Sequence, residues 1–131
     1  MKEGAARRFL VVDAAMNDLI RPALYSAWHE IVPVLAPAAG APRRPIDVVG
    51  PICESGDCFA EQRLMPPLAA GELVAMLSAG AYGAVMSSSY NTRLMVPEVL
   101  VRGDAFGIIR PRPGYEQLLS LDKMPDWLAE R

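Results

Sequence analysis

Turn residues divide the chain into many short apolar runs, and this division most constrains what it can fold into. β-branched and aliphatic residues predict strands at 8–13, 46–49 and 58–63. Residues 29–34 predict another strand, in which Pro33 indicates an edge or an end. Short strands need partners around a shared core, so the sequence predicts a mostly β domain, a sandwich or a barrel, with short helices.

The second half of the chain adds one strand and a hairpin. Residues 73–78 form a short apolar run bounded by turn residues, which predicts a strand buried on both faces. Residues 98–101 and 106–110 flank Arg102-Gly103-Asp104 and predict a hairpin. That tripeptide also spells an adhesion motif, but its place between two β-rich runs favours a simple turn.

The segments between the strands predict loops and short helices. Asn17 and Asp18 could cap a helix over residues 19–25, in which Pro22 is tolerated only in the first turn. Residues 36–45 are rich in Ala, Pro and Gly without periodicity and predict a surface loop. Two further segments predict a tight turn at residues 80–83 and a helical tail at 114–131.

Composition and charge exclude several classes of protein. The 131 residues suit one compact domain, and a formal net charge of −2 leaves no electrostatic footprint for nucleic acid. No signal peptide or membrane-spanning run is recognisable, so we expect a cytoplasmic protein with no membrane partner. Cys53 and Cys58 do not make a disulfide framework, and one histidine without a Cys-x-x-Cys pair argues against a metal site.

A thiol and a carboxylate stand side by side in residues 50–57, between two apolar runs. Turn residues at both ends of this stretch separate it from the strands. Cys53 and Glu54 are therefore expected on a loop, where their side chains can reach a ligand. A thiol that can move a proton, beside an anion that can hold an ammonium group, indicates an amino-acid site.

Three motifs occur in order along the chain: residues 12–25 with Arg21 and Tyr25, residues 50–57, and Gly80-Ala81-Tyr82-Gly83. Together they resemble the C-terminal domain of diaminopimelate decarboxylases, and the similarity covers nearly the whole chain. The wider group is the alanine-racemase-like, fold-type III decarboxylases, which depend on pyridoxal phosphate and include ornithine decarboxylase. Its members pair an N-terminal (β/α)₈ barrel with a C-terminal β-domain, and this chain is similar only to the second part.

The resemblance implies that the barrel is absent from residues 1–131, because such a barrel needs on the order of 250 residues. In the family, the lysine that binds the cofactor covalently lies on the barrel, and Lys2 and Lys123 stand in unrelated contexts. We therefore expect a single C-terminal β-domain of a two-domain enzyme, present as a fragment, a split product or a truncated gene. Alone, it should neither hold pyridoxal phosphate nor act as a decarboxylase.

The resemblance also implies roles for individual residues. Cys53 resembles the family's proton donor, and Glu54 resembles the acid that binds the substrate's distal ammonium group. Arg21 and Tyr25 match the pair that holds the distal carboxylate, and their spacing of four would place them on one helical face. Tyr82 matches the tyrosine that binds both cofactor and substrate. In the family the loop reaches a neighbouring subunit, which implies a homodimer with shared active sites.

Each of these residues also has a structural explanation. Cys53 could be a small buried hydrophobe, and Glu54 could be a solvated turn residue. Arg21 and Tyr25 could form a stacked surface pair, and Tyr82 could fill the core at a turn. Their joint occurrence in order favours the functional interpretation.

Two other residues with reactive side chains are expected to be structural. His29 is expected to be a strand residue with a satisfied hydrogen bond. Cys58 is expected to contribute to packing.

The first hypothesis is a domain of the enzyme that converts meso-2,6-diaminopimelate to L-lysine and CO₂ in lysine biosynthesis. Its partners would be a small amino-acid substrate, the N-terminal barrel and a second copy. The alternatives are a non-catalytic dimerisation or interaction module and the same domain of an ornithine- or arginine-type decarboxylase. Because the distal carboxylate separates diaminopimelate from ornithine, Arg21 and Tyr25 favour the first hypothesis within the group.

Overall fold

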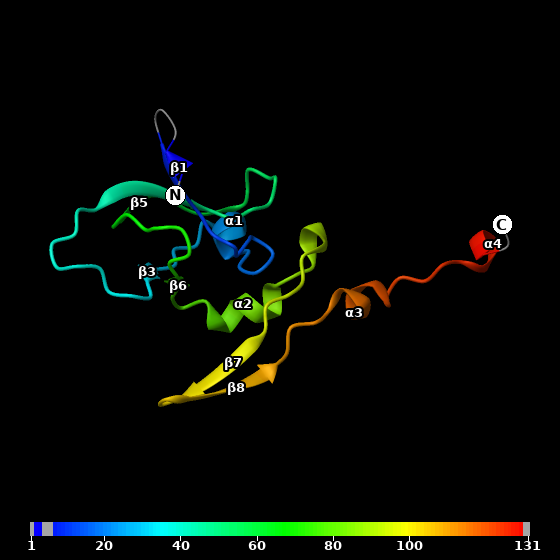
Figure 1. The fold of residues 1–131 in the computed structure, drawn as a ribbon. Coiled ribbons are helices and arrows are strands. Elements are labelled where there is room, and N and C mark those ends of the chain that lie inside the picture. Colours follow the sequence, from blue (N-terminus) through cyan, green and yellow to red (C-terminus); the bar gives the residue numbers. More distant parts are fainter. Residues whose placement is uncertain (1, 4–6, 130–131) are drawn as a thin grey trace.

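The computed structural model describes residues 2–3 and 7–129, and β-structure predominates in it as the sequence predicts (Figure 1). The strands are β1 (Lys2–Glu3), β2 (Arg8–Val11), β3 (Ile31–Pro33), β4 (Arg44–Val49), β5 (Cys58–Met65), β6 (Val74–Met76), β7 (Glu98–Arg102) and β8 (Ala105–Arg110). The helices are α1 (Arg21–Tyr25), α2 (Gly80–Met86), α3 (Tyr115–Leu119) and α4 (Asp126–Ala129), and a 3₁₀ turn, η1, covers Tyr90–Thr92.

Three sheets organise the described residues. The largest has the strand order β1-β2-β4-β5, in which β2 and β4 run parallel and the other neighbours antiparallel. Antiparallel pairs β3–β6 and β7–β8 form the other two sheets. Across the described part of the chain these sheets stay separate, and none closes into a barrel.

The core lies against the large sheet. Eight buried side chains form one cluster: Leu10, Leu19, Ile31, Ile46, Val48, Phe59, Ala60 and Met65. Burying a large aliphatic side chain stabilises a fold by roughly 1.5–3 kcal/mol. This cluster therefore fixes β2, β4 and β5 relative to one another, and it gives the segments between them a rigid base.

The predicted hairpin is confirmed as β7 and β8, which extend away from the large sheet in Figure 1. Gly103 stands in its turn with a φ of +61°, a conformation that glycine adopts without steric cost. Every side chain of β8 is exposed, and Phe106 keeps 75% of its accessible surface. The core described above does not cover this hairpin.

Predictions at the first helix are partly wrong. Asn17 and Asp18 do not cap it, because the Asp18 carboxylate instead accepts the backbone N–H of Ala15 at 2.9 Å within a separate turn. Helix α1 starts after Ile20, which gives no side-chain cap. Pro22 lies in its first turn, as expected.

Residues 80–83 are not a tight turn but the start of α2. The backbone N–H of Gly83 donates to the carbonyl of Ala79 at 2.7 Å, which closes the first helical turn. Two glycines suggested a turn, but glycine only disfavours a helix by about 1 kcal/mol and does not forbid it.

Two strand predictions also need correction. Strand β6 is half-buried rather than buried on both faces, because its sheet has only two strands. Strand β4 begins at Arg44, inside the segment predicted as a loop, because Arg44 pairs with Met65 of the long strand β5.

Among the described residues, no helix is long and apolar enough to cross a membrane. In the same part of the chain, no group of three or more His, Cys, Asp and Glu side chains could hold a metal ion.

Candidate active site

The loop between β4 and β5 is organised by one buried carboxylate. Asp57 is only 3% exposed and accepts the backbone N–H groups of Ile52 and Met16, each at 2.7 Å. The backbone N–H of Gly50 donates to the carbonyl of Asp57 at 3.0 Å. A Cβ at Gly50 would lie 2.3 Å from the Asp57 carboxylate, so glycine is required there. Asp57 therefore closes the loop and fastens it to the turn before α1.

The closed loop presents Cys53 and Glu54 to solvent. The Cys53 thiol is exposed, which excludes the explanation of this residue as a buried hydrophobe. Glu54 is not simply solvated, because its Oε2 accepts a short hydrogen bond from the Tyr90 hydroxyl. That hydrogen bond, together with the negative charge of Glu54, raises the pKa of Tyr90.

Tyr90 was not identified as a site residue from the sequence. It lies on η1, 36 residues after Glu54, and its neighbours carry no pattern that points to the loop. Only the fold brings the two side chains together.

Arg21 of α1 and Tyr82 of α2 are also brought together. The Arg21 guanidinium lies over the Tyr82 ring, 5.1 Å from its centroid, which is a cation–π contact. Tyr82 is 54% exposed, so it does not fill the core at a turn. Arg21 therefore stacks on Tyr82 rather than on Tyr25, which stands at the end of α1 with 61% of its surface exposed.

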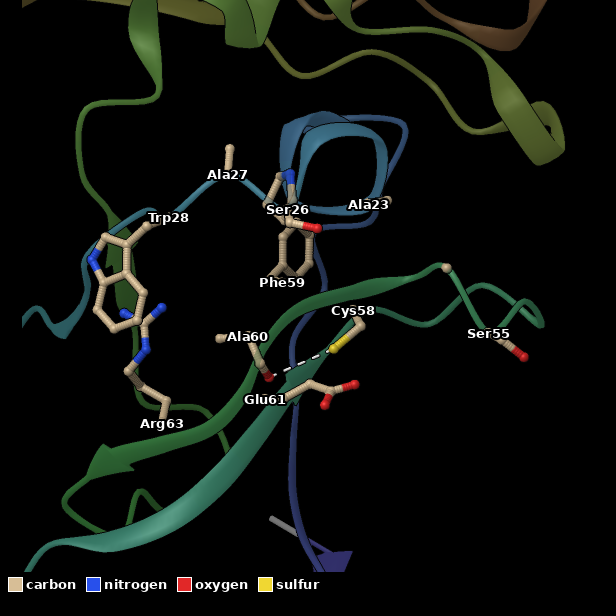
Figure 2. A pocket seen from close by; sticks show the side chains of 12 residues that line it. Ala23, Ser26, Ala27, Trp28, Ser55, Cys58, Phe59, Ala60, Glu61 and Arg63 are labelled. Carbon is tan, nitrogen blue, oxygen red and sulfur yellow. Dashed lines mark hydrogen bonds between the residues drawn. The ribbon is translucent and has the colours of Figure 1, made fainter.

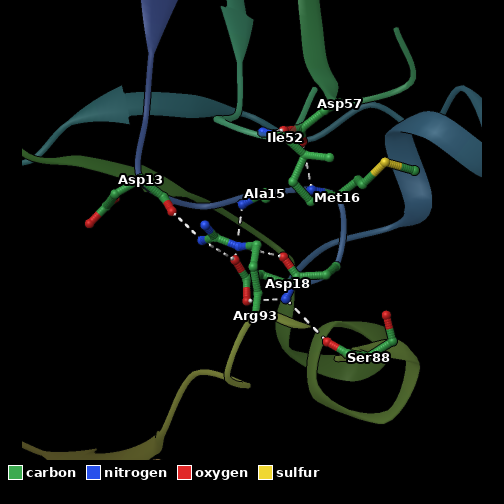
Figure 3. A network of polar contacts seen from close by, with 9 residues as sticks. Asp13, Ala15, Met16, Asp18, Ile52, Asp57, Ser88 and Arg93 are labelled. Atoms are coloured by element: carbon green, nitrogen blue, oxygen red, sulfur yellow. Dashed lines mark hydrogen bonds and ion pairs between the residues drawn. The ribbon is translucent and has the colours of Figure 1, made fainter. Parts of the chain in front are cut away.

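A network of polar contacts joins the segment after α2 to the turn before α1 (Figure 3). Asn17 is 1% exposed. Its Nδ2 donates a hydrogen bond to the carbonyl of Ser88 at 3.1 Å, and its Oδ1 accepts one from Nε of Arg93 at 2.9 Å. Arg93 also donates to the carbonyl of Asp13 at 2.6 Å and lies 3.7 Å from the Asp18 carboxylate. These contacts hold the segment that carries Tyr90 against the turn to which Asp57 fastens the Cys53–Glu54 loop.

A surface pocket of about 360 Å³ lies where these segments meet. Its lining consists of Met16, Asn17, Ile20, Glu54, Ser88 and Tyr90. Glu54 provides the negative charge in this lining, so the pocket suits a cationic group such as an ammonium.

A second pocket, of about 380 Å³, lies between α1 and β5 (Figure 2). Arg63 is 8% exposed there, stacks 3.3 Å from the ring centroid of Trp28, and donates to the carbonyl of His29 at 2.9 Å. The Cys58 thiol donates to the carbonyl of Ala60 at 3.6 Å, and burial raises the pKa of Cys58. None of the five predicted site residues lines this pocket.

Cys58 packs as expected, and the prediction for His29 is only partly confirmed, because its buried Nε2 has no hydrogen-bond partner among the described residues. His29 is 2% exposed, and its Nδ1 lies 3.1 Å from the carbonyl of Leu77. It stands two residues before β3 rather than within it. Cys58 is partly buried at the first position of β5.

Comparison with known proteins identifies the family. The sequence model of the pyridoxal-dependent decarboxylase C-terminal sheet domain matches residues 1–80. The chain belongs to this family. Among relatives, diaminopimelate decarboxylase of Zymomonas mobilis is 46% identical over 98% of this chain, and that of Pseudomonas aeruginosa is 52% identical over 90% of it. The chain spans 30% and 28% of the lengths of these two relatives.

Solved structures give the same result for the fold. A protein described as AQ1208 from Aquifex aeolicus is 44% identical, has a TM-score of 0.86, and matches 92% of this chain with 29% of its own. Diaminopimelate decarboxylase from Helicobacter pylori, complexed with L-lysine, is 40% identical with a TM-score of 0.82, and matches 92% of this chain with 29% of its own. The sheet domain is therefore that of the pyridoxal-dependent decarboxylases, and the matched relatives are more than three times longer.

The described residues fit one side of a site for the family's cofactor. Tyr82 is 54% exposed and the Arg21 guanidinium lies over its ring, so the pair offers a phenol and a cation, a combination that suits an anionic group such as a phosphate or a carboxylate. Lys123 lies between α3 and α4, at the end of the chain that Figure 1 draws far from α1. The Arg21–Tyr82 pair thus fits an anionic group of the cofactor, and Lys123 lies outside this pair.

Proposed function

We propose that this chain is the C-terminal domain of a cytoplasmic diaminopimelate decarboxylase, which converts meso-2,6-diaminopimelate to L-lysine and CO₂. One observation supports it most: the loop with Cys53 and Glu54 is fastened through Asp57 to the turn that leads into α1, where Arg21 lies over Tyr82. An acid and a free thiol on the loop are thus linked to the turn that precedes the cation of α1, although these residues come from two separate segments of the chain. An amino acid with charges at both ends suits such a set.

In this proposal each residue binds or moves a defined group. Glu54 binds the distal ammonium of the substrate as a charge-assisted pair, and Arg21 binds the distal carboxylate together with Tyr25. When bound, pyridoxal phosphate supplies the electron sink for the electrons that remain when CO₂ departs. Tyr82 contacts the cofactor and the substrate. The Cys53 thiol returns a proton to the substrate Cα, acting as a general acid.

The proposal includes two protein partners. The exposed apolar side chains of β7 and β8, with Leu100 62% and Ile108 61% exposed, need a cover that the described residues do not provide. We assign that cover to the N-terminal barrel domain of the same enzyme. Cys53 and Glu54 then extend toward the active site of a second subunit in a homodimer.

Steady-state kinetics of the full-length enzyme that carries this domain test the roles. Cys53→Ala should lower kcat by about 100-fold or more with a small change in KM, because it removes a proton donor. Arg21→Ala should raise KM for diaminopimelate at least about ten-fold, since a charged hydrogen bond is lost. Arg43→Ala, at an exposed position in the loop before β4, is the matched control and should change neither constant.

Two results would contradict the proposal. Unchanged turnover by Cys53→Ala removes the proton-donor role, and an unaffected KM in Arg21→Ala favours a substrate without a distal carboxylate. The 131-residue chain alone should release no CO₂ from diaminopimelate.

A further inference from the structure

We propose that Tyr90 is a positioning residue for Glu54: its hydroxyl holds one carboxylate oxygen and leaves the other for the ligand's ammonium. This inference rests on the proposed function, in which Glu54 binds that ammonium. The sequence motifs of the site do not include Tyr90.

The hydrogen bond joins two segments that are independently fixed. The Tyr90 hydroxyl donates to Oε2 of Glu54, and the two residues line the same pocket. Glu54 stands on the loop closed by Asp57. Because neither backbone is free to drift, the side-chain contact has a fixed geometry.

The backbone around Tyr90 supports this interpretation. Asn91 and Thr92, which follow it, have left-handed φ values of 60° and 57°. Asparagine adopts this conformation readily, but a β-branched threonine does so only at a cost, and such strain clusters at functional positions. On either side, the backbone N–H of Ser88 donates to the carbonyl of Asn17 at 2.9 Å, and Arg93 donates to the Asn17 side chain. The strained residues are therefore held between two anchors.

The other oxygen of Glu54 stays accessible because residue 56 has no side chain. A Cβ at Gly56 would lie 3.3 Å from Oε1 of Glu54, which is tighter than most real contacts. Gly56 thus leaves this oxygen without a side-chain contact, while the Tyr90 hydroxyl holds the other oxygen. A side chain at Gly56 would crowd Oε1 and shift it by a few tenths of an ångström.

The chemistry of a phenol suits a positioning role beside a binding carboxylate. A carboxylate offers about four acceptor positions, and the hydroxyl occupies one of them. Glu54 raises the pKa of Tyr90, first through the hydrogen bond and then through its charge, so the phenol stays neutral at physiological pH. Tyr90 therefore orients Glu54 without neutralising the charge that attracts the ammonium.

A double-mutant cycle in the full-length, pyridoxal-phosphate-loaded enzyme tests the proposal. Tyr90→Phe keeps the ring and removes the hydroxyl, and it should raise KM for diaminopimelate about five-fold with kcat changed less than about two-fold. In a Glu54→Gln background the same substitution should add little, because the partner is already altered. Tyr115→Phe, on exposed α3, is the matched control and should leave KM unchanged.

The Gly56→Ala variant provides an independent test of the proposal. It crowds Glu54 from the opposite side and should raise KM in the same direction as Tyr90→Phe. An unchanged KM in Tyr90→Phe, or a full additional effect of that substitution in the Glu54→Gln background, overturns the proposal.

A spectrophotometric titration of the tyrosines separates failure of this inference from failure of the proposed function. Glu54→Gln should lower the titration midpoint of one tyrosine, and that component should be missing in Tyr90→Phe. If no such shift is observed, the hydrogen bond between Tyr90 and Glu54 is contradicted. A clear shift with an unchanged KM in Glu54→Gln instead overturns the ammonium-binding role of Glu54, and the positioning role with it.

Discussion

Replacing Asp57 by alanine should destabilise the domain more than any other single change in the loop it closes. Asp57 is 3% exposed, and its carboxylate accepts the backbone N–H groups of Ile52 and Met16 at 2.7 Å each. A hydrogen bond to a charged group contributes roughly 1.5–3 kcal/mol, and a buried donor left without a partner adds to the loss. The Met16 contact is only partly buried, so we expect about 3 kcal/mol in total.

Urea denaturation followed by circular dichroism measures this change. With an m-value of about 2 kcal/mol/M, the loss corresponds to a midpoint lower by roughly 1.5 M. Asp57→Asn keeps one acceptor oxygen and should lose about half as much. Asp122→Ala, at an exposed position between α3 and α4, is the control and should leave the midpoint in place. If Asp57→Ala shifts the midpoint no more than this control does, the carboxylate does not organise the loop.

Three further predictions concern stability and reactivity. Burial raises the pKa of Asp47, but hydrogen bonds from Gln62 and Arg7 outweigh this effect and leave the pKa below its ordinary value. The ionised carboxylate therefore stabilises the fold above about pH 4, and this stabilisation is lost as the pH falls further. Thermal melting should show this loss in the wild-type protein and not in Asp47→Asn. Ile46→Ala, at a 1% exposed position, should cost about 2–5 kcal/mol in urea denaturation, whereas Ile109→Ala, 61% exposed, should cost under about 1 kcal/mol; equal losses would contradict the assigned core. Iodoacetamide at pH 8 should alkylate exposed Cys53 well before Cys58, whose pKa is raised by burial, and peptide mass spectrometry would show the reverse order if this assignment is wrong.

The pattern of neighbouring residues in the sequence was enough to predict most of the strands. The β-branched run at residues 46–49 and the paired runs around Gly103 form strands in the structure because their pattern and their neighbours favour the same state. Local signals were insufficient where a choice depends on tertiary partners. Gly80 and Gly83 allow either a turn or a helix, and a two-stranded sheet leaves β6 half-buried although its sequence is apolar.

The same distinction applies to the site. Cys53 and Glu54 could be placed on a loop because turn residues surround them in the sequence. The stacking of Arg21 on Tyr82 and the hydrogen bond from Tyr90 to Glu54 join residues 61 and 36 positions apart. No periodicity spans such separations, so these contacts could be found only in the folded structure.

The bond from Arg93 to the carbonyl of Asp13 has a kinetic consequence. This hydrogen bond joins residues that are 80 positions apart, and the neighbouring hydrogen bond from Arg93 to Asn17 joins residues that are 76 positions apart. Contacts of such long range form late, because the entropy of closing the chain must be lost before they contribute. During synthesis, the Cys53–Glu54 loop leaves the ribosome well before Arg93 does. We therefore expect the Arg93 contacts that anchor the segment of Tyr90 to form after the large sheet, whose β2–β4 pairs span only 38 residues.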